Sequence, residues 1–266
     1  MNANDYLNQY YANYDEEGRL LTRYGRVEFE TTMRYIRRYL QDGARIIEIG
    51  AGTGRYSHTL ACEGYAVDAV ELVQHNIDQF IAGTAEGENV TIRQGSACDL
   101  TGFPDDTYDV TLLLGPMYHL FTETEKLAAL SEAIRVTKPG GVIFVAYCMA
   151  DPSILMHGFM KGNIHALIDQ GMLDPLTFKA FSHPWDLFEL HRTEDIVELR
   201  GRFNVEPLHC VAADGYANHM RDTVAGMDDT TFDIYLRYHF STCERADMLG
   251  LSHHTLDIFR KTDNKG

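Results

Sequence analysis

The chain has 266 residues, of which 45% are hydrophobic, and it carries 39 acidic against 23 basic residues, a formal net charge of −16. This composition supports a buried core and excludes a largely disordered chain. The negative charge disfavours a nucleic-acid partner, whose phosphates it would repel. No apolar run reaches the roughly 18–20 residues of a membrane-spanning helix, so we expect no membrane partner. The polar N-terminus and five scattered cysteines without a CxxC pair predict a cytoplasmic protein with reduced thiols.

Helix and strand patterns alternate through the first 150 residues. Apolar residues at helical spacing predict a helix over 28–40. Strands are predicted at 44–49, 65–72, 89–95, 108–115 and 142–148, with helices at 54–62, 73–83 and 122–137 between them. Thr122 and Glu125 have the spacing of a capping box at the start of the last of these helices, and 138–141 is predicted as a turn. This alternation predicts a doubly wound α/β fold with a mostly parallel sheet.

The alternation ends after residue 150. Residues 151–182 and 216–249 have irregular helical patterns, 193–202 predicts a helix, and 203–212 and 254–261 predict strands. We therefore predict a single domain over 1–266 with a seven-stranded Rossmann-like sheet, whose core comprises 44–150, 191–212 and 252–261. The remaining segments would form an N-terminal helical cap (1–43) and two helical lid insertions (151–190 and 213–250).

A glycine-rich turn follows the first predicted strand. Gly50, Gly52 and Gly54 carry no side chain and allow a ligand to approach the backbone. Open α/β sheets bind ligands at the carboxyl ends of their strands. Because Arg55 breaks the G-x-G-x-x-G pattern of dinucleotide sites, a nicotinamide-dependent oxidoreductase is disfavoured. Glu71 ends the second strand, where a carboxylate could accept hydrogen bonds from the two hydroxyls of a ribose.

Five segments together carry a family resemblance: EIGAGTGRY, VDAVEL, QGSACDL, DVTLLLGPMYHL and RVTKPGGVIFVAY. With them, residues 44–148 resemble the class I S-adenosylmethionine-dependent methyltransferases, nearest to the small-molecule branch that includes the ubiquinone and menaquinone C-methyltransferases. The resemblance implies an enzyme that moves a methyl group by in-line displacement from S-adenosylmethionine to a small-molecule acceptor. It implies S-adenosylhomocysteine as product, and no metal.

The resemblance also assigns cofactor contacts by position. Glu48 would lie near the methionine amino group, Glu71 would bind the ribose hydroxyls and Leu72 would pack against the adenine. Many family members have an Asp where this chain has Ser96, so Ser96 or Asp99 would accept from the adenine amino group, Asp99 being otherwise a turn residue. The full expected set is Glu48, Gly50, Ala51, Gly52, Gly54, Glu71, Leu72, Ser96, Ala97, Asp99, Leu114, Gly115 and Tyr24.

The segment after the fourth strand bears on the acceptor. Methyltransferases that act on amino groups of nucleic acids and proteins often carry Asn/Asp-Pro-Pro-Tyr/Phe here, and Gly115 has no side chain to bind such an amine. A general base would assist a hydroxyl or protonated amine acceptor. His119 and Tyr118 are the candidate catalytic residues, although His119 could simply bond nearby backbone and Tyr118 could form a pocket wall. The more distant candidates are His183, His191 and His253.

An aromatic N-terminal segment that closes over the cofactor is common in this family. By position, Tyr14, Arg19, Tyr24 or Arg26 would reach the methionine carboxylate or the acceptor; alternatively, these residues belong to a helix on the flank of the sheet. Three alternative functions stay open: a protein methyltransferase, an RNA methyltransferase, and a non-catalytic protein that binds S-adenosylmethionine.

Overall fold

One eight-stranded sheet organises the molecule. The computed structural model describes residues 3–13, 18 and 21–262. The strand order is β3-β2-β1-β4-β5-β8-β7, with β6 beside β5. The strands are β1 (Arg45–Ile49), β2 (Ala66–Glu71), β3 (Val90–Gln94), β4 (Tyr108–Leu113), β5 (Thr137–Met149), β6 (Leu190–His191), β7 (Val205–Ala212) and β8 (His254–Lys261). All neighbouring pairs are parallel except β8 with β5 and with β7. The predicted α/β class and mostly parallel sheet are confirmed, and the two-residue β6 is the strand beyond the predicted seven.

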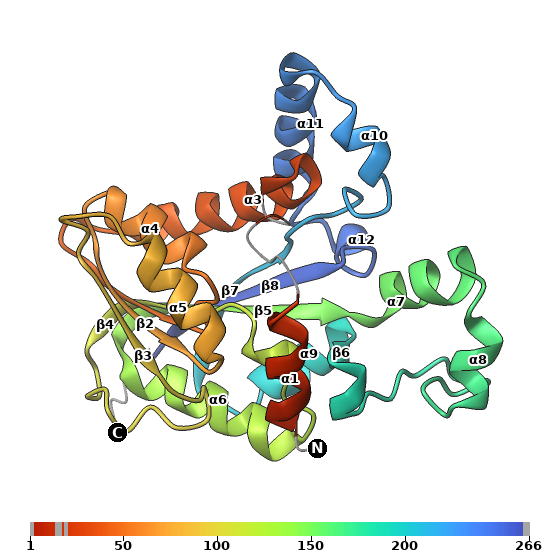
Figure 1. Ribbon diagram of the computed structural model, residues 1–266, viewed down its shortest axis with the longest axis horizontal. Helices are drawn as coiled ribbons and strands as arrows, with labels where there is room; N and C mark the ends of the chain where they lie inside the picture. Colours follow the sequence, from red (N-terminus) through yellow and green to blue (C-terminus); the bar gives the residue numbers. More distant parts are fainter. Residues whose placement is uncertain (1–2, 14–17, 19–20, 263–266) are drawn as a thin grey trace.

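Helices cover both faces of this sheet (Figure 1). On one face lie α3 (Arg23–Tyr39), α4 (Arg55–Cys62) and α5 (Gln74–Gly83); on the other lie α6 (Glu123–Val136) and α9 (Thr193–Arg200). Successive side chains along each strand point to opposite faces of the sheet, so each strand contributes apolar residues to the core on both sides. Ile46 belongs to the same apolar core as Met33 of α3, while its neighbour Ile47 belongs to the core that contains Leu130 of α6. All four side chains are at most 1% exposed, and each such burial contributes about 1.5–3 kcal/mol.

Two boundaries differ from the sequence prediction. The first long helix starts at Arg23 because Thr22 caps it, its Oγ1 accepting the Gly25 N–H at 3.1 Å. Residues 138–141, predicted as a turn, belong to β5, and Gly140 adopts a φ of +80° within it. The pairing with β4 shifts register between Tyr108 and Val110, so the glycines mark an irregularity within the strand. The capping box of Thr122 and Glu125 is confirmed.

The remaining helices lie toward the carboxyl ends of the parallel strands (Figure 1). They are α1 (Ala3–Tyr11), α7 (Ala150–Ser153), the π-helix η2 (Ile154–Met160), α8 (Ile164–Asp169), α10 (Arg221–Ala225), α11 (Asp229–Thr242) and α12 (Ala246–Leu249), with 3₁₀ turns η1 (Pro116–Tyr118) and η3 (Pro184–Asp186). Helix α1 contacts both α5 and η3, and so bridges the two halves of the sheet. The role of these segments as cap and lids stays a prediction. Across the described part of the chain, no helix is long and apolar enough to cross a bilayer.

Candidate functional site

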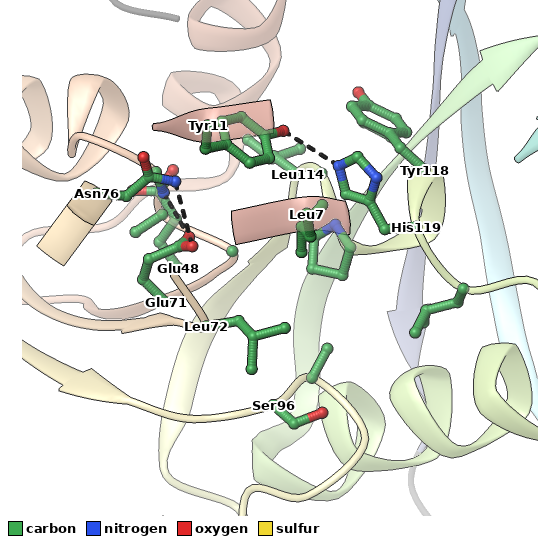
Figure 2. Close-up of a pocket in the computed structure, with 18 of the residues that line it drawn as sticks. Leu7, Tyr11, Glu48, Glu71, Leu72, Asn76, Ser96, Leu114, Tyr118 and His119 are labelled. Carbon is green, nitrogen blue, oxygen red and sulfur yellow. Dashed lines mark hydrogen bonds between the residues drawn. The ribbon is translucent and has the colours of Figure 1, made fainter. Parts of the chain in front are cut away.

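A cavity of about 400 Å³ opens at the carboxyl ends of β1, β2 and β4, and α1 crosses it (Figure 2). Most residues expected from the sequence line it: Glu48, Gly50, Ala51, Gly52, Glu71, Leu72, Ser96, Ala97, Leu114, Gly115, Tyr118 and His119. They come from turns that follow four different strands. The parallel sheet brings these turns to one edge, as expected for an open α/β fold.

The glycine turn after β1 meets two separate constraints. Gly50 has a φ of +78°, and a Cβ added there would lie 2.5 Å from Cδ of Pro116, so the turn can pack on the loop after β4 only without a side chain. Gly52 has a φ of +55°, and an added Cβ would meet no atom within 4 Å. Since Gly52 lines the cavity, its missing side chain keeps space open for a ligand.

Glu71 presents a carboxylate at the tip of β2. Its Oε2 accepts the Gly52 N–H at 2.9 Å, and its Oε1 accepts the Val73 N–H at 2.9 Å and the Asn76 amide at 3.3 Å. Burial raises the pKa of Glu71, and these bonds oppose the rise. A carboxylate offers about four lone-pair sites, so Glu71 can still accept a hydrogen bond from a ligand hydroxyl.

Glu48 is a second, deeper acid, only 1% exposed. Its Oε2 accepts the Ser57 N–H at 3.0 Å and also the Ser57 hydroxyl, which ties the end of β1 to the first turn of α4. Burial raises the pKa of Glu48 to about 8, despite both bonds. The cavity therefore contains an acid that is largely protonated at neutral pH, and that a cationic ligand group would ionise.

His119 links three separate segments of the chain. Its Nδ1 lies 2.7 Å from the carbonyl oxygen of Leu187. A carbonyl only accepts, so Nδ1 carries the proton, and Nε2 accepts the Tyr11 hydroxyl at 3.1 Å. Burial lowers the pKa of His119 to about 4, so the ring is neutral at physiological pH. Figure 2 shows the bond joining α1 to the segment after β4.

Arg55 is the only Arg or Lys among the described residues that line this cavity. Its guanidinium lies 4.8 Å from the ring centre of Phe29, and no described residue bonds its buried Nε. From sequence, Arg55 was notable only because it breaks the dinucleotide glycine pattern. Its place in the wall makes it a candidate partner for a ligand carboxylate.

Three expected cofactor residues do not line the cavity. Gly54 precedes α4 with a φ of +92°, and a Cβ there would lie 2.5 Å from Phe80, so it serves packing. Asp99 is exposed, and its Oδ1 accepts the Thr101 N–H at 3.1 Å. This is the bond of a turn residue, the second role considered for Asp99 from the sequence. Tyr24 packs in a separate apolar cluster with Val27.

The remaining candidates of the N-terminal segment also lie elsewhere. Arg26 lies 3.7 Å from Glu30 and does not line the cavity. Tyr14 and Arg19 fall outside the described residues. Instead, Leu7 and Tyr11 of α1 reach the cavity. They are four positions apart and so share one helix face, a signal the sequence did contain.

The other histidine candidates are dispersed. His183 is exposed and stacks on Trp185 at 4.5 Å between ring centres. His191 lies in β6 against Tyr147 and lines a different cleft, and burial lowers its pKa to about 3. His253 lies outside the first cavity, in the second cleft described below.

His254, at the start of β8, forms a buried charge cluster in the cavity wall. Its Nδ1 lies 2.9 Å from Asp214 Oδ2 and 3.3 Å from Glu28 Oε2. Burial disfavours the imidazolium, but the Glu28 and Asp214 carboxylates outweigh burial and raise the pKa of His254 well above its ordinary value. One potential metal-ligating atom from each residue lies within 4.8 Å of the others. The expectation that the protein needs no metal stays a prediction.

A second cleft, of about 580 Å³, adjoins the first cavity. Tyr11, Tyr118 and His254 line both, and so form their common wall. The rest of the second cleft is built by the segment from β5 to β6 and by the residues around α10. It combines aromatic and aliphatic side chains with a few polar ones, a composition typical of small-molecule sites.

Comparisons with known proteins identify a methyltransferase domain in this chain. Residues 46–141 match the family model described as a methyltransferase domain. A demethylmenaquinone methyltransferase of Clavibacter sepedonicus is 33% identical over 111 residues, which cover 41% of this chain and 43% of that protein. A probable tRNA methyltransferase 9B of Mus musculus is 29% identical over 121 residues, covering 41% of this chain and 24% of that protein. The chain thus spans less than half of either relative's length.

Solved structures extend the likeness to the whole fold. An S-adenosylmethionine-dependent methyltransferase of Thermotoga maritima, described as a possible histamine N-methyltransferase, covers 98% of this chain with a TM-score of 0.58 at 15% identity, and the match covers 100% of that chain. The likeness in fold therefore extends well beyond the matched domain. Residues 46–141 therefore form a methyltransferase domain, and the chain as a whole has the fold of an S-adenosylmethionine-dependent methyltransferase.

Proposed function

We propose that this protein transfers a methyl group from S-adenosylmethionine to a small-molecule acceptor. The observation that carries the proposal is the pairing of Gly52 with Glu71 at the carboxyl edge of the sheet, inside the matched domain. An open backbone turn beside a partly satisfied carboxylate suits a ribose that must lie close to the chain.

The charges along the cavity fit the cofactor. Glu48 and Glu71 are acids at two points of the wall, and Arg55 is a cation at a third. In this arrangement, Glu71 would accept ribose hydroxyls, Glu48 would hold the methionine ammonium, and Arg55 would bind the methionine carboxylate. Leu72 offers an apolar surface to the adenine, and Ser96 offers a hydroxyl whose oxygen already accepts the Cys98 N–H at 3.2 Å.

The cofactor supplies a methyl group on a sulfonium: as the acceptor's electron pair bonds the carbon, the carbon–sulfur pair goes to sulfur and leaves a neutral thioether. The chain must orient the acceptor and exclude water. Tyr11, Tyr118 and His254 form the wall through which the two cavities meet. His119 already accepts the Tyr11 hydroxyl, so we propose that it positions Tyr11 over the site. An acceptor proton would then leave by another route, which favours an acceptor that is already nucleophilic.

A small acceptor fits this chain better than RNA. The formal charge is −16, and Arg55 and Arg221 are the only Arg or Lys among the described residues that line the two cavities. Such a surface offers few counter-charges for a phosphate backbone. Gly115, which lines the cavity, provides no side-chain acceptor for a nucleobase amine.

Calorimetric titration with S-adenosylhomocysteine, with NAD as the comparison ligand, tests the cofactor assignment. Gly52→Ala and Gly87→Ala form a matched pair, because both glycines have positive φ and open space where a Cβ would lie, and only Gly52 lines the cavity. Each substitution should cost about 1–3 kcal/mol of folding stability from backbone strain. Only Gly52→Ala should weaken S-adenosylhomocysteine binding, by roughly tenfold or more.

Equal binding by the two variants, or binding of NAD alone, would reject the cofactor assignment. If S-adenosylhomocysteine binds as expected, methyl transfer to a panel of small acceptors can be measured by release of that product. Binding without any turnover, across acids, phenols, amines and thiols, would favour the non-catalytic alternative.

A further inference from the structure

We propose that the second cleft is the acceptor site and that Arg221 selects an acceptor with an apolar body and a carboxylate. The inference rests on the proposed function, since the cleft receives a methyl acceptor only if the first cavity binds S-adenosylmethionine. The two spaces share the wall formed by Tyr11, Tyr118 and His254, so a ligand in the cleft lies beside the cofactor cavity.

One group of lining residues is apolar and comes from the segment between β5 and β6. The Met172 N–H donates to the Leu167 carbonyl at 2.9 Å, and the Phe181 N–H donates to the Met172 carbonyl at 2.9 Å, which fixes the backbone of these three lining residues. Ile154 of η2 joins them in the lining. On the side of α1, the rings of Tyr10 and Phe188 meet edge to face at 5.8 Å. These groups would cover a hydrocarbon or aromatic body.

A second group is polar and surrounds Arg221. The Arg221 Nε and one of its Nη atoms donate to Asn218 Oδ1 at 2.9 and 2.6 Å, and its guanidinium lies 5.0 Å from the ring centre of Tyr24. The Asn218 amide donates in turn to Asp214. The guanidinium is thus held in place by a neutral amide and an aromatic face, and Tyr24, expected at the cofactor, instead supports this arginine.

Arg221 has no carboxylate within 4.0 Å among the described residues. The nearest buried acid along this network, Asp214, is already engaged by His254. Of the described residues that line the cleft, only Asp186 carries a carboxylate, and it accepts the His183 N–H at 2.8 Å at the start of η3. A guanidinium has five N–H donors, so after its two bonds to Asn218 it can still bind a carboxylate with paired hydrogen bonds.

Two histidines near Arg221 add no further charge to the cleft. His157 and His253 line the same cleft. Burial lowers the pKa of both, and the charge of Arg221 lowers each further. Neutral imidazoles next to a guanidinium can donate hydrogen bonds to an anion without adding a competing charge. The cleft therefore combines an apolar chamber with one cationic anchor.

The test uses three probes of one shape: 4-phenylbutyrate, 4-phenylbutanol and 4-phenylbutylamine. Their binding to the full chain saturated with S-adenosylhomocysteine is measured by calorimetry. The acid should bind roughly five- to tenfold more tightly than the alcohol, and the amine most weakly. Arg221→Gln should remove the preference for the acid and leave the affinity for the alcohol unchanged. The control Arg260→Gln, at an exposed arginine paired with Glu206 on β8 and β7, should keep the preference.

Each other result overturns the proposal in a recognisable way. Suppose that S-adenosylhomocysteine binds with equal affinity to the wild type, Arg221→Gln and Arg260→Gln. If the acid then binds no more tightly than the alcohol, or if its advantage persists in Arg221→Gln, the carboxylate assignment is wrong and the cofactor assignment stands. Tighter binding of the amine would assign the aromatic wall to a cationic acceptor instead. Failure of all three proteins to bind S-adenosylhomocysteine would reject the proposed function and, with it, the acceptor site.

Discussion

At the scale of single residues, we expect Glu48 to couple ligand binding to the release of a proton. Burial raises its pKa to about 8, so the free protein holds this proton at pH 6.5. An ammonium group beside Glu48 would favour the carboxylate and expel the proton. The affinity for S-adenosylhomocysteine should therefore rise with pH from 6 to about 8, by at most tenfold per unit, and then level off.

Calorimetry in two buffers of different ionisation enthalpy measures this proton release directly. Glu48→Gln should bind more weakly, with an affinity that is flat over the same range. The stability of the ligand-free protein should change with pH in the opposite direction to the affinity. The pKa of Glu48 in the folded chain lies above its ordinary value of 4.5. Glu48 therefore stabilises the fold fully below pH 4.5, and this contribution is lost as the pH rises from 4.5 toward 8. Wild-type stability should fall relative to Glu48→Gln across that window, and no change would show that Glu48 is already charged.

At the scale of elements, α1 crosses the first cavity and is held there by tertiary contacts. Leu7 is 9% exposed, and Tyr11 donates to His119. The helix has nine residues, too short to be stable alone in water. Its placement over the cavity therefore depends on these tertiary contacts.

Tyr11→Phe should release bound S-adenosylhomocysteine faster. Loss of one hydrogen bond, worth about 1 kcal/mol, corresponds to roughly a fivefold higher dissociation rate, with little change in Tm. Stopped-flow displacement measures the rate. Tyr6→Phe is the matched control, because Tyr6 is on the same helix and does not line the cavity. Because burial lowers the pKa of His119 to about 4, the difference between the variants should not change between pH 5.5 and 8. Equal release rates would mean that α1 does not retain the ligand.

At the scale of the whole molecule, the charge distribution bears on the acceptor. Several basic residues of the first long helix are already paired with acids, as in Arg23 with Asp229 at 2.8 Å and Arg37 with Glu63 at 2.5 Å. These cations contribute little net positive potential to a surface that carries −16 overall. We therefore expect unmodified tRNA to bind with a Kd weaker than about 100 µM at roughly 150 mM salt.

Fluorescence anisotropy with labelled tRNA at two salt concentrations checks this expectation. Tight binding that weakens steeply with salt would contradict it and would favour an RNA acceptor, in line with the relative described as a probable tRNA methyltransferase. Absence of binding at low salt as well would leave the small acceptor as the stronger proposal.

Much of the fold followed from local patterns. Residues 108–113 are mostly apolar and form a central strand buried on both faces, and Thr122 with Glu125 forms the predicted capping box. The position of the first cavity could also be predicted, because the turns after parallel strands converge on one edge of the sheet. The segments predicted as lids were harder to assign, since their helices are short and their exposed positions carry apolar residues such as Phe159 and Leu176, 54% and 89% exposed.

The sequence by itself determined the doubly wound sheet, the glycine turn and Glu71, because these depend on periodicity and on residues close together in the chain. The tertiary structure alone decided which tyrosine of the N-terminal segment reaches the cavity, that Asp99 and Tyr24 do not, and that Arg221 meets a cleft built by a distant segment. Those placements depend on how α1, α10 and the residues between β5 and β6 pack against the sheet edge, and no local pattern encodes contacts between segments that lie far apart in the chain.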